Sequence, residues 1–96
     1  MKYLVIDAYV SGTGIRDKYE GGYIFPKDLG LNNDIVNQIN VWLSKYENEH
    51  FNGFVNGDII TELDKEGKEI AEKIKDKLVD IKIEYFSAAK MTREIL

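Results

Sequence analysis

The chain has no cysteine, one proline and one histidine among its 96 residues. Without cysteine it can form no disulfide, no thiolate nucleophile and no zinc site that needs sulfur ligands. Its apolar runs fall well short of the roughly 20 residues that a membrane-spanning helix needs. The apolar run at the N-terminus is short and is interrupted by Asp7. We therefore expect neither a signal peptide nor a membrane partner, and we expect a cytoplasmic protein.

Positive charge is also scarce. The chain carries 13 Lys and Arg against 17 Asp and Glu, which gives a formal net charge of −4. Nucleic-acid-binding proteins usually have the opposite sign, because neutralising phosphates supplies much of their affinity. The composition predicts no nucleic-acid partner and is compatible with a basic protein partner. Hydrophobic residues make up 44% of the chain, and no linker or repeat divides it, so we predict a single domain spanning residues 1–96.

Two segments have the pattern of β-strands. Residues 2–10 have apolar side chains at both alternating sets of positions, which predicts an inner strand of a sheet. Residues 81–86 alternate apolar and polar side chains, as a half-buried strand does. The glycine-rich stretch 11–31 predicts an ordered loop with room for a short strand at residues 22–25. Residues 87–96 are predicted to form a short helix or a loose tail.

The first of two predicted helices begins near Asn33, a good N-cap residue. It ends at a polar break over residues 48–57. Its buried stripe has the three- and four-residue spacing of an amphipathic helix and includes the tryptophan, which we interpret as a core residue. The stripe consists of Ile35, Ile39, Trp42, Leu43 and Tyr46.

The second predicted helix runs from Asp58 or Thr61 to Leu78. Gly67 lies in its apolar stripe, where the missing side chain would let a neighbouring element approach closely. Asp64 and Lys68 are four residues apart and are expected to pair on its solvent face.

These elements predict an α+β fold in the order β-loop-(β)-α-α-β. A crossover through two helices makes the first and last strands parallel neighbours, with both helices on one face of a sheet of two to three strands. The other face would carry Tyr3, Val5 and Tyr9. Either the loop covers that face or it is a binding surface.

Three features could carry chemistry, and each has a simpler structural interpretation. His50 lies in Glu47-Asn48-Glu49-His50 at a fraying helix end, where a cationic side chain suits the helix dipole, whereas a general base would need an orienting acid and a substrate pocket. The segment Ser11–Gly14 follows a strand, as phosphate-binding loops do, but lacks both the Walker ending and a following helix. The acids of the N-terminal third lack the register of a calcium loop: Asp7, Asp17, Glu20 and Asp28. We predict no catalytic residue, no cofactor and no metal site.

The loop is unusually rich in aromatic residues. Tyr19, Tyr23 and Phe25 lie close to Arg16 and to acidic residues. Tyrosine and arginine are enriched among the residues that dominate protein–protein binding. The same side chains could simply cover the sheet, and the sequence leaves both interpretations open.

Two stretches resemble a known kind of protein. In the first, Gly22–Leu31, a glycine and an apolar pair precede Leu-Gly-Leu, and a helix follows with Trp42 and Tyr46-Glu47 towards its end. The second joins a glycine-bearing helix at 66–71 to a closing strand with an aromatic pair at 80–86. Over residues 20–86 the chain is similar to small bacterial immunity proteins of the contact-dependent growth inhibition type, which are encoded beside a secreted toxin.

The resemblance implies a cytoplasmic, non-catalytic protein that neutralises its cognate toxin about one-to-one by covering the toxin's active site. Many such toxins are nucleases, and an acidic inhibitor suits a basic cleft. We expect the partner-binding surface to comprise Asp17, Tyr19, Glu20, Tyr23 and Asp28. Two alternatives stay open. One is a small nucleotide- or metal-binding enzyme that uses Ser11–Gly14 with Asp7, and the other is an oligomerising regulatory domain.

Overall fold

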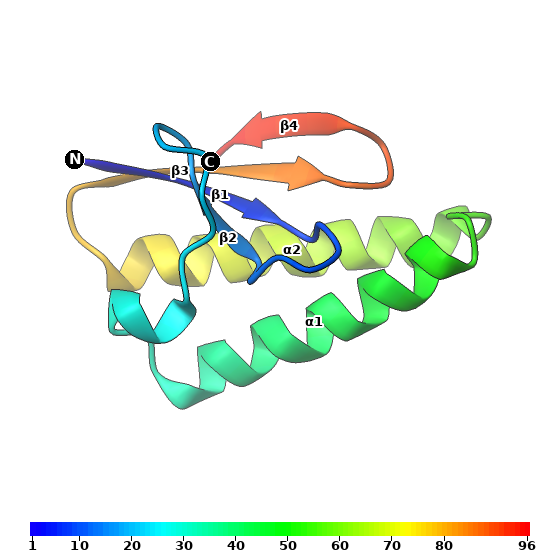
Figure 1. Ribbon diagram of the computed structural model, residues 1–96, viewed down its shortest axis with the longest axis horizontal. Coiled ribbons are helices and arrows are strands. Elements are labelled where there is room, and N and C mark those ends of the chain that lie inside the picture. The colour runs from blue at the N-terminus through cyan, green and yellow to red at the C-terminus, as the bar shows by residue number, and fades with distance from the viewer.

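The computed structural model describes residues 1–96 as a four-stranded sheet with two helices packed on one face (Figure 1). The strands β1 (Lys2–Asp7), β2 (Ile15–Asp17), β3 (Ile81–Ser87) and β4 (Thr92–Ile95) lie in the order β2-β1-β3-β4. The helices are α1 (Asn33–Phe51), α2 (Gly57–Lys77) and a short 3-10 helix, η1 (Pro26–Leu29). The α+β class and the one-sided helix layer are confirmed. None of the helices combines the length and apolarity needed to cross a membrane.

The two central strands, β1 and β3, are parallel, as the two-helix crossover requires. Leu4 lies opposite Ile83, and Ile6 opposite Tyr85. Strands β2 and β4 add antiparallel edges to β1 and β3. The prediction of an inner first strand is therefore confirmed, because β1 has a neighbour on each side.

The expectation of two to three strands is wrong, because the sheet has four strands and the prediction lacks the two short edge strands. Residues 15–17, predicted as loop, form β2, whereas Tyr23 contributes only an isolated bridge to Arg16. Residues 92–95, predicted as helix or tail, form β4, all of whose residues are exposed. Backbone pairing and the turn before β4, with its Met91 N–H donating to the Ser87 carbonyl at 2.8 Å, hold this edge. Such a strand needs no apolar alternation, so hydrophobic periodicity does not reveal it.

The helix ends also differ from prediction. Asn32, not Asn33, caps α1, because its Oδ1 accepts the Ile35 N–H at 2.9 Å. The helix continues into the predicted polar break and ends at Phe51, and the Phe54 N–H then donates to the Glu49 carbonyl at 2.8 Å. Asn56 caps α2 in the same way as Asn32 caps α1, through the Ile59 N–H. Thr61 is therefore inside α2, where its hydroxyl donates to the Gly57 carbonyl.

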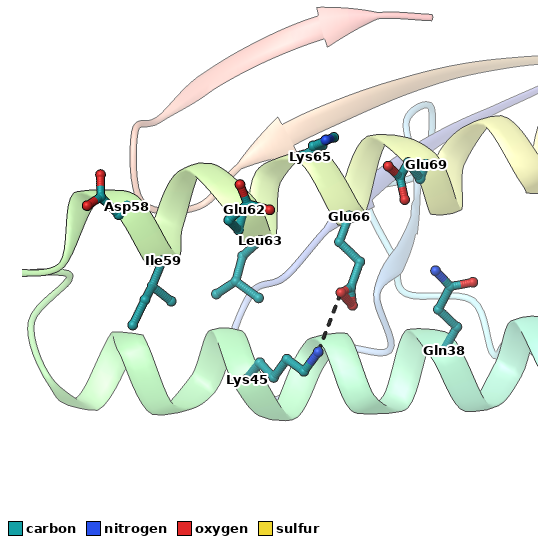
Figure 2. A pocket seen from close by; sticks show the side chains of 9 residues that line it. All are labelled: Gln38, Lys45, Asp58, Ile59, Glu62, Leu63, Lys65, Glu66 and Glu69. Carbon is teal, nitrogen blue, oxygen red and sulfur yellow. Dashed lines mark ion pairs between the residues drawn. The ribbon is translucent and has the colours of Figure 1, made fainter.

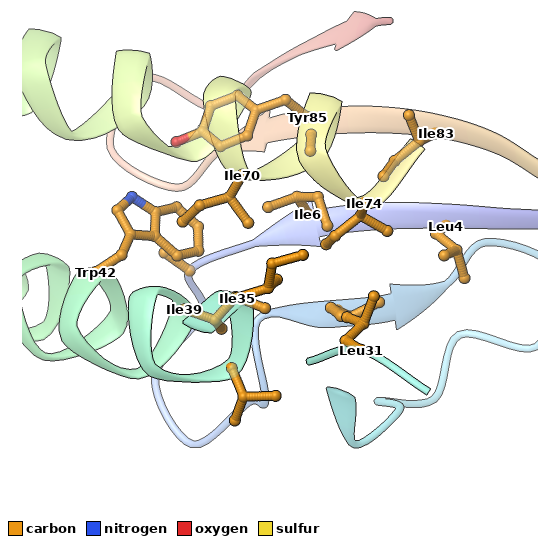
Figure 3. Packing of buried hydrophobic residues seen from close by; sticks show 14 of the residues in the cluster. Leu4, Ile6, Leu31, Ile35, Ile39, Trp42, Ile70, Ile74, Ile83 and Tyr85 are labelled. Atoms are coloured by element: carbon orange, nitrogen blue, oxygen red, sulfur yellow. The ribbon is translucent and has the colours of Figure 1, made fainter. Parts of the chain in front are cut away.

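The core lies between the sheet and the two helices (Figure 3). Trp42 is fully buried, and its Nε1 donates to the Leu63 carbonyl at 2.8 Å. Gly67 of α2 lies directly against the rings of Trp42 and Tyr85, so the predicted close approach is confirmed. The largest apolar side chains of this layer are Leu4, Ile6, Ile15, Ile39, Ile70, Ile74 and Ile83.

Candidate functional site

The segment 17–23, here called the hairpin turn, is built by hydrogen bonds around Asp17. The Asp17 N–H donates to the Gly22 carbonyl at 2.8 Å, and the Gly21 N–H donates to the Asp17 carbonyl at 2.7 Å. The Asp17 carboxylate accepts the backbone N–H groups of Tyr19 and Glu20 at 2.8 and 3.2 Å. Gly21 has a φ of 80°, a left-handed conformation that glycine adopts without strain. The turn therefore has a defined backbone.

Two tyrosine rings are held on this backbone while staying accessible. Tyr19 packs edge-on against Tyr3, with ring centroids 5.9 Å apart, and is 67% exposed. Tyr23 is 37% exposed and lies over Gly12, where even a Cβ atom would come within 2.5 Å of the ring. Each ring thus packs against a neighbouring residue on one side and is accessible to solvent on the other.

Four of the five residues expected to bind a partner lie together in the hairpin turn: Asp17, Tyr19, Glu20 and Tyr23. The fifth, Asp28, is exposed on η1, which Figure 1 shows beside the helix layer and away from the turn. The Asp17 carboxylate accepts backbone hydrogen bonds within the turn, so Glu20 is the acid that the turn exposes to solvent.

A buried carboxylate that the sequence did not indicate anchors the hairpin turn to the open face of the sheet. Glu84 of β3 is only 2% exposed and accepts the Tyr3 hydroxyl at 2.8 Å. Lys18 of the turn lies 3.3 Å from the same carboxylate. The hydrogen bond to Glu84 raises the pKa of Tyr3, so the phenol is a neutral donor. Glu84 occupies a polar position of an alternating strand, which normally indicates solvent exposure.

The sequence allowed two interpretations of this sheet face, as a face covered by the loop or as a binding surface. In the structure the loop covers part of it. Val5 is buried and Tyr3 half-buried, whereas Tyr9 is exposed. A free surface made of Tyr3, Val5 and Tyr9 together does not exist in this structure.

The Ser11–Gly14 segment is a tight connection between β1 and β2. Ser11 and Gly14 both have positive φ, and the Gly12 N–H donates to the Tyr9 carbonyl. A strand follows the segment, so no helix N-terminus is available to face a phosphate. Gly14 lies against the Ile39 side chain, where a Cβ would approach to 2.8 Å. These contacts give the segment a structural role.

Asp7, at the end of β1, is buried and pairs with Arg16 at 3.3 Å. Its Oδ1 accepts the Tyr9 N–H at 3.1 Å. Burial raises the pKa of this carboxyl above its ordinary value, and the Arg16 guanidinium offsets only part of that rise.

The raised pKa of Asp7 predicts a pH dependence that asparagine removes. The folded state holds the Asp7 proton more tightly than the unfolded state does. The stability gained from this proton is fully present below the pKa that Asp7 has in the unfolded chain, and it is lost as pH rises through the pKa that Asp7 has in the folded protein. Between about pH 3 and about pH 7, the wild type should lose stability relative to Asp7→Asn. Urea unfolding of both proteins at the two pH values measures this difference. A relative gain by the wild type would mean that the Arg16 pair outweighs burial.

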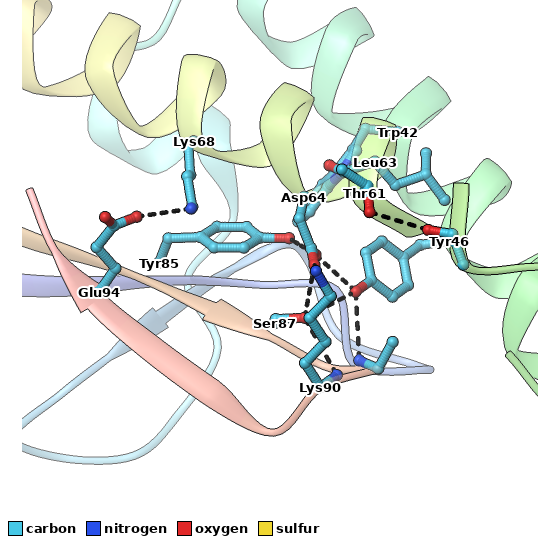
Figure 4. Close-up of polar contacts among 12 residues, drawn as sticks. Trp42, Tyr46, Thr61, Leu63, Asp64, Lys68, Tyr85, Ser87, Lys90 and Glu94 are labelled. Carbon is cyan, nitrogen blue, oxygen red and sulfur yellow. Dashed lines mark hydrogen bonds and ion pairs between the residues drawn. The ribbon is translucent and has the colours of Figure 1, made fainter. Parts of the chain in front are cut away.

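A second polar cluster, centred on Asp64, joins both helices to β3 (Figure 4). Its Oδ1 accepts the hydroxyls of Tyr46 and Tyr85 at 2.8 and 2.6 Å, and its Oδ2 accepts that of Ser87 at 2.8 Å. Burial raises the pKa of both phenols, which keeps them protonated as donors. The prediction that Asp64 pairs with Lys68 on the solvent face is wrong, because Asp64 is buried and Lys68 Nζ lies 2.8 Å from Glu94 Oε2.

A groove of about 610 Å³ runs along the outer side of the helix pair (Figure 2). Lys45 of α1 and Glu66 of α2 face each other across it at 3.6 Å. Other acids of α2 line it, including Asp58, Glu62 and Glu69. Residues 33–77 contain ten Asp and Glu against six Lys, so the negative charge of the chain is concentrated on its helix layer.

The remaining candidates for chemistry have ordinary surroundings. His50 is exposed at the end of α1 and packs edge-on against Phe54, with ring centroids 5.3 Å apart. No group of three or more acids and histidines lies close enough to hold a metal ion. Comparisons of the chain with protein-family models, curated proteins and solved structures gave no significant match.

Proposed function

We propose that this chain is a cytoplasmic immunity protein that binds one toxin domain and inhibits it by covering its active site. The hairpin turn is the anchor of the interface. The chain itself performs no reaction in this proposal. Its function is the formation of a tight, specific complex.

The observation that carries the proposal is the pair of accessible tyrosines on a fixed backbone. Tyr19 and Tyr23 are each supported by a neighbour, and Asp17 and Lys18 tie the turn to itself and to the sheet. A side chain that is already ordered loses little conformational freedom when it binds. Tyrosine also buries a large area with few rotatable bonds, which suits a hot-spot residue.

The charge of the chain supports a basic partner, such as a nuclease, but the excess acids lie on the helix layer and not in the hairpin turn, where the sequence predicted the contact. Residues 16–20 contain two acids, Asp17 and Glu20, and two basic residues, so this stretch carries no net charge. The excess negative charge lies on the helix layer, and long-range attraction does not require direct contact. In the proposal, the helix layer speeds encounter with a basic cleft, and the tyrosines hold the complex together.

Alanine at Tyr19 or Tyr23 is expected to weaken the toxin complex about tenfold or more, as loss of a hot-spot residue does. The measurement is isothermal titration against the toxin domain encoded beside this chain. Phe51→Ala is the matched control, because Phe51 is an aromatic residue that is 72% exposed at the C-terminal end of α1, outside the hairpin turn. Affinities of both tyrosine variants within about threefold of wild type would exclude the hairpin turn as the anchor.

A further inference from the structure

A cavity of about 530 Å³ opens where the two central parallel strands end. Three segments supply most of its lining: the end of β1, the end of β3 with the turn to β4, and the connection between α1 and α2. Arg16 of β2 and two residues of the hairpin turn, Gly21 and Tyr23, also line it. Figure 1 shows these three segments at the same end of the molecule. Ligands of open α/β sheets bind outside the carboxyl ends of parallel strands, and this cavity has that position.

Most of the cavity wall is apolar. Val10, Phe54, Phe86, Ala88 and Met91 contribute to it from all three of these segments. Small-molecule sites typically have this size and this makeup, with an apolar wall and a few polar groups that fix the orientation of the ligand.

The polar groups of the cavity have unused capacity for an anion. Arg16 pairs with Asp7 through Nη2 at 3.3 Å, and its side chain is 35% exposed, so part of it stays accessible. Arg93 is 63% exposed, and its nearest acid, Glu84, lies 3.9 Å away and is already engaged by Tyr3 and Lys18. The carboxylate of Asp7 is occupied by Arg16 and the Tyr9 N–H. Positive charge is therefore left over, while no acid of the cavity is free.

We propose that this cavity binds a small organic carboxylate with an apolar body. The carboxylate lies between the Arg16 and Arg93 guanidinium groups, and the apolar body packs against Phe54 and Phe86. Guanidinium donors match a carboxylate in geometry and charge. Tyr23 belongs both to the cavity wall and to the proposed toxin interface, but the inference does not depend on toxin binding, because the isolated chain carries the complete cavity.

The test is an NMR titration of the isolated, ¹⁵N-labelled chain with 3-phenylpropionate. We expect amide shifts confined to the residues around the cavity: the ends of β1 and β3, the turn before β4, and the neighbourhoods of Arg16, Phe54 and Arg93. The neutral analogue 3-phenylpropanol should bind about tenfold more weakly, because charge-assisted hydrogen bonds are lost. Acetate, which lacks the apolar body, should bind more weakly still.

Two variants sharpen the result. Arg93→Gln should lower the affinity for 3-phenylpropionate about threefold, as removal of one exposed charge does. Lys82→Gln removes a charge from the same face outside the cavity and should leave the affinity unchanged. Equal binding of the alcohol, equal binding of acetate, or no shift in these segments at millimolar 3-phenylpropionate would each overturn the proposal.

Discussion

Replacing Asp64 with alanine is expected to lower the free energy of unfolding by about 3–5 kcal/mol. The carboxylate accepts three buried hydroxyl groups, from Tyr46, Tyr85 and Ser87. Alanine would leave all three donors without that acceptor in the interior. The measurement is the urea unfolding midpoint, interpreted with an unchanged denaturant slope.

Asp64→Asn is the matched control for this effect. Its amide oxygen can still accept both tyrosine hydroxyls, and its NH₂ group can donate to the Ser87 oxygen. We expect the asparagine variant to lose only about 1–2 kcal/mol. If asparagine proved as damaging as alanine, the negative charge would matter more than the three hydrogen bonds. If alanine were tolerated, the cluster would not hold the helices to β3.

Gly67→Ala is expected to destabilise the protein by about 2–3 kcal/mol, although alanine is the better helix former by about 1 kcal/mol. A Cβ at this position would lie in the Tyr85 ring and 2.8 Å from Trp42 Cζ2. Neither ring can yield easily, since both are buried and each donates a hydrogen bond, Tyr85 to Asp64 and Trp42 to Leu63. Overpacking therefore outweighs helix propensity here.

Gly57→Ala provides the comparison for Gly67→Ala. Gly57 opens the same helix, and an added Cβ would meet no atom within 4 Å. Its replacement should change the thermal midpoint little. A stabilising effect of alanine at both positions would show that α2 does not need the close approach at Gly67.

The parts of the fold that hydrophobic periodicity specifies were predictable from the sequence. The strand predicted at residues 2–10 is apolar on both faces and is central, although it ends at Asp7, and the stripes of both helices face the sheet. Gly67 stood out because a glycine inside an apolar stripe needs a packing reason. The edge strands were missed because backbone pairing, not side-chain burial, holds β2 and β4.

The polar interior was not predictable from local patterns. Asp64 sits four residues before Lys68, which suggests a surface pair, yet its partners Tyr85 and Ser87 lie 21 and 23 residues further on. Glu84 likewise accepts a hydrogen bond from Tyr3, which lies 81 residues earlier in the chain. In the candidate site, the clustering of Tyr19 and Tyr23 followed from their nearness in sequence, whereas the separation of Asp28 depends on the path of the chain through η1.

The most direct test of the proposed function is to titrate the neighbouring toxin domain with this chain and follow the toxin's catalytic activity. The proposal predicts that activity falls linearly and is abolished at about one equivalent, as tight one-to-one binding requires. The Tyr19→Ala, Tyr23→Ala double variant should need a large excess for the same inhibition. Full toxin activity in the presence of excess wild-type chain would contradict the proposal that this protein is an immunity protein.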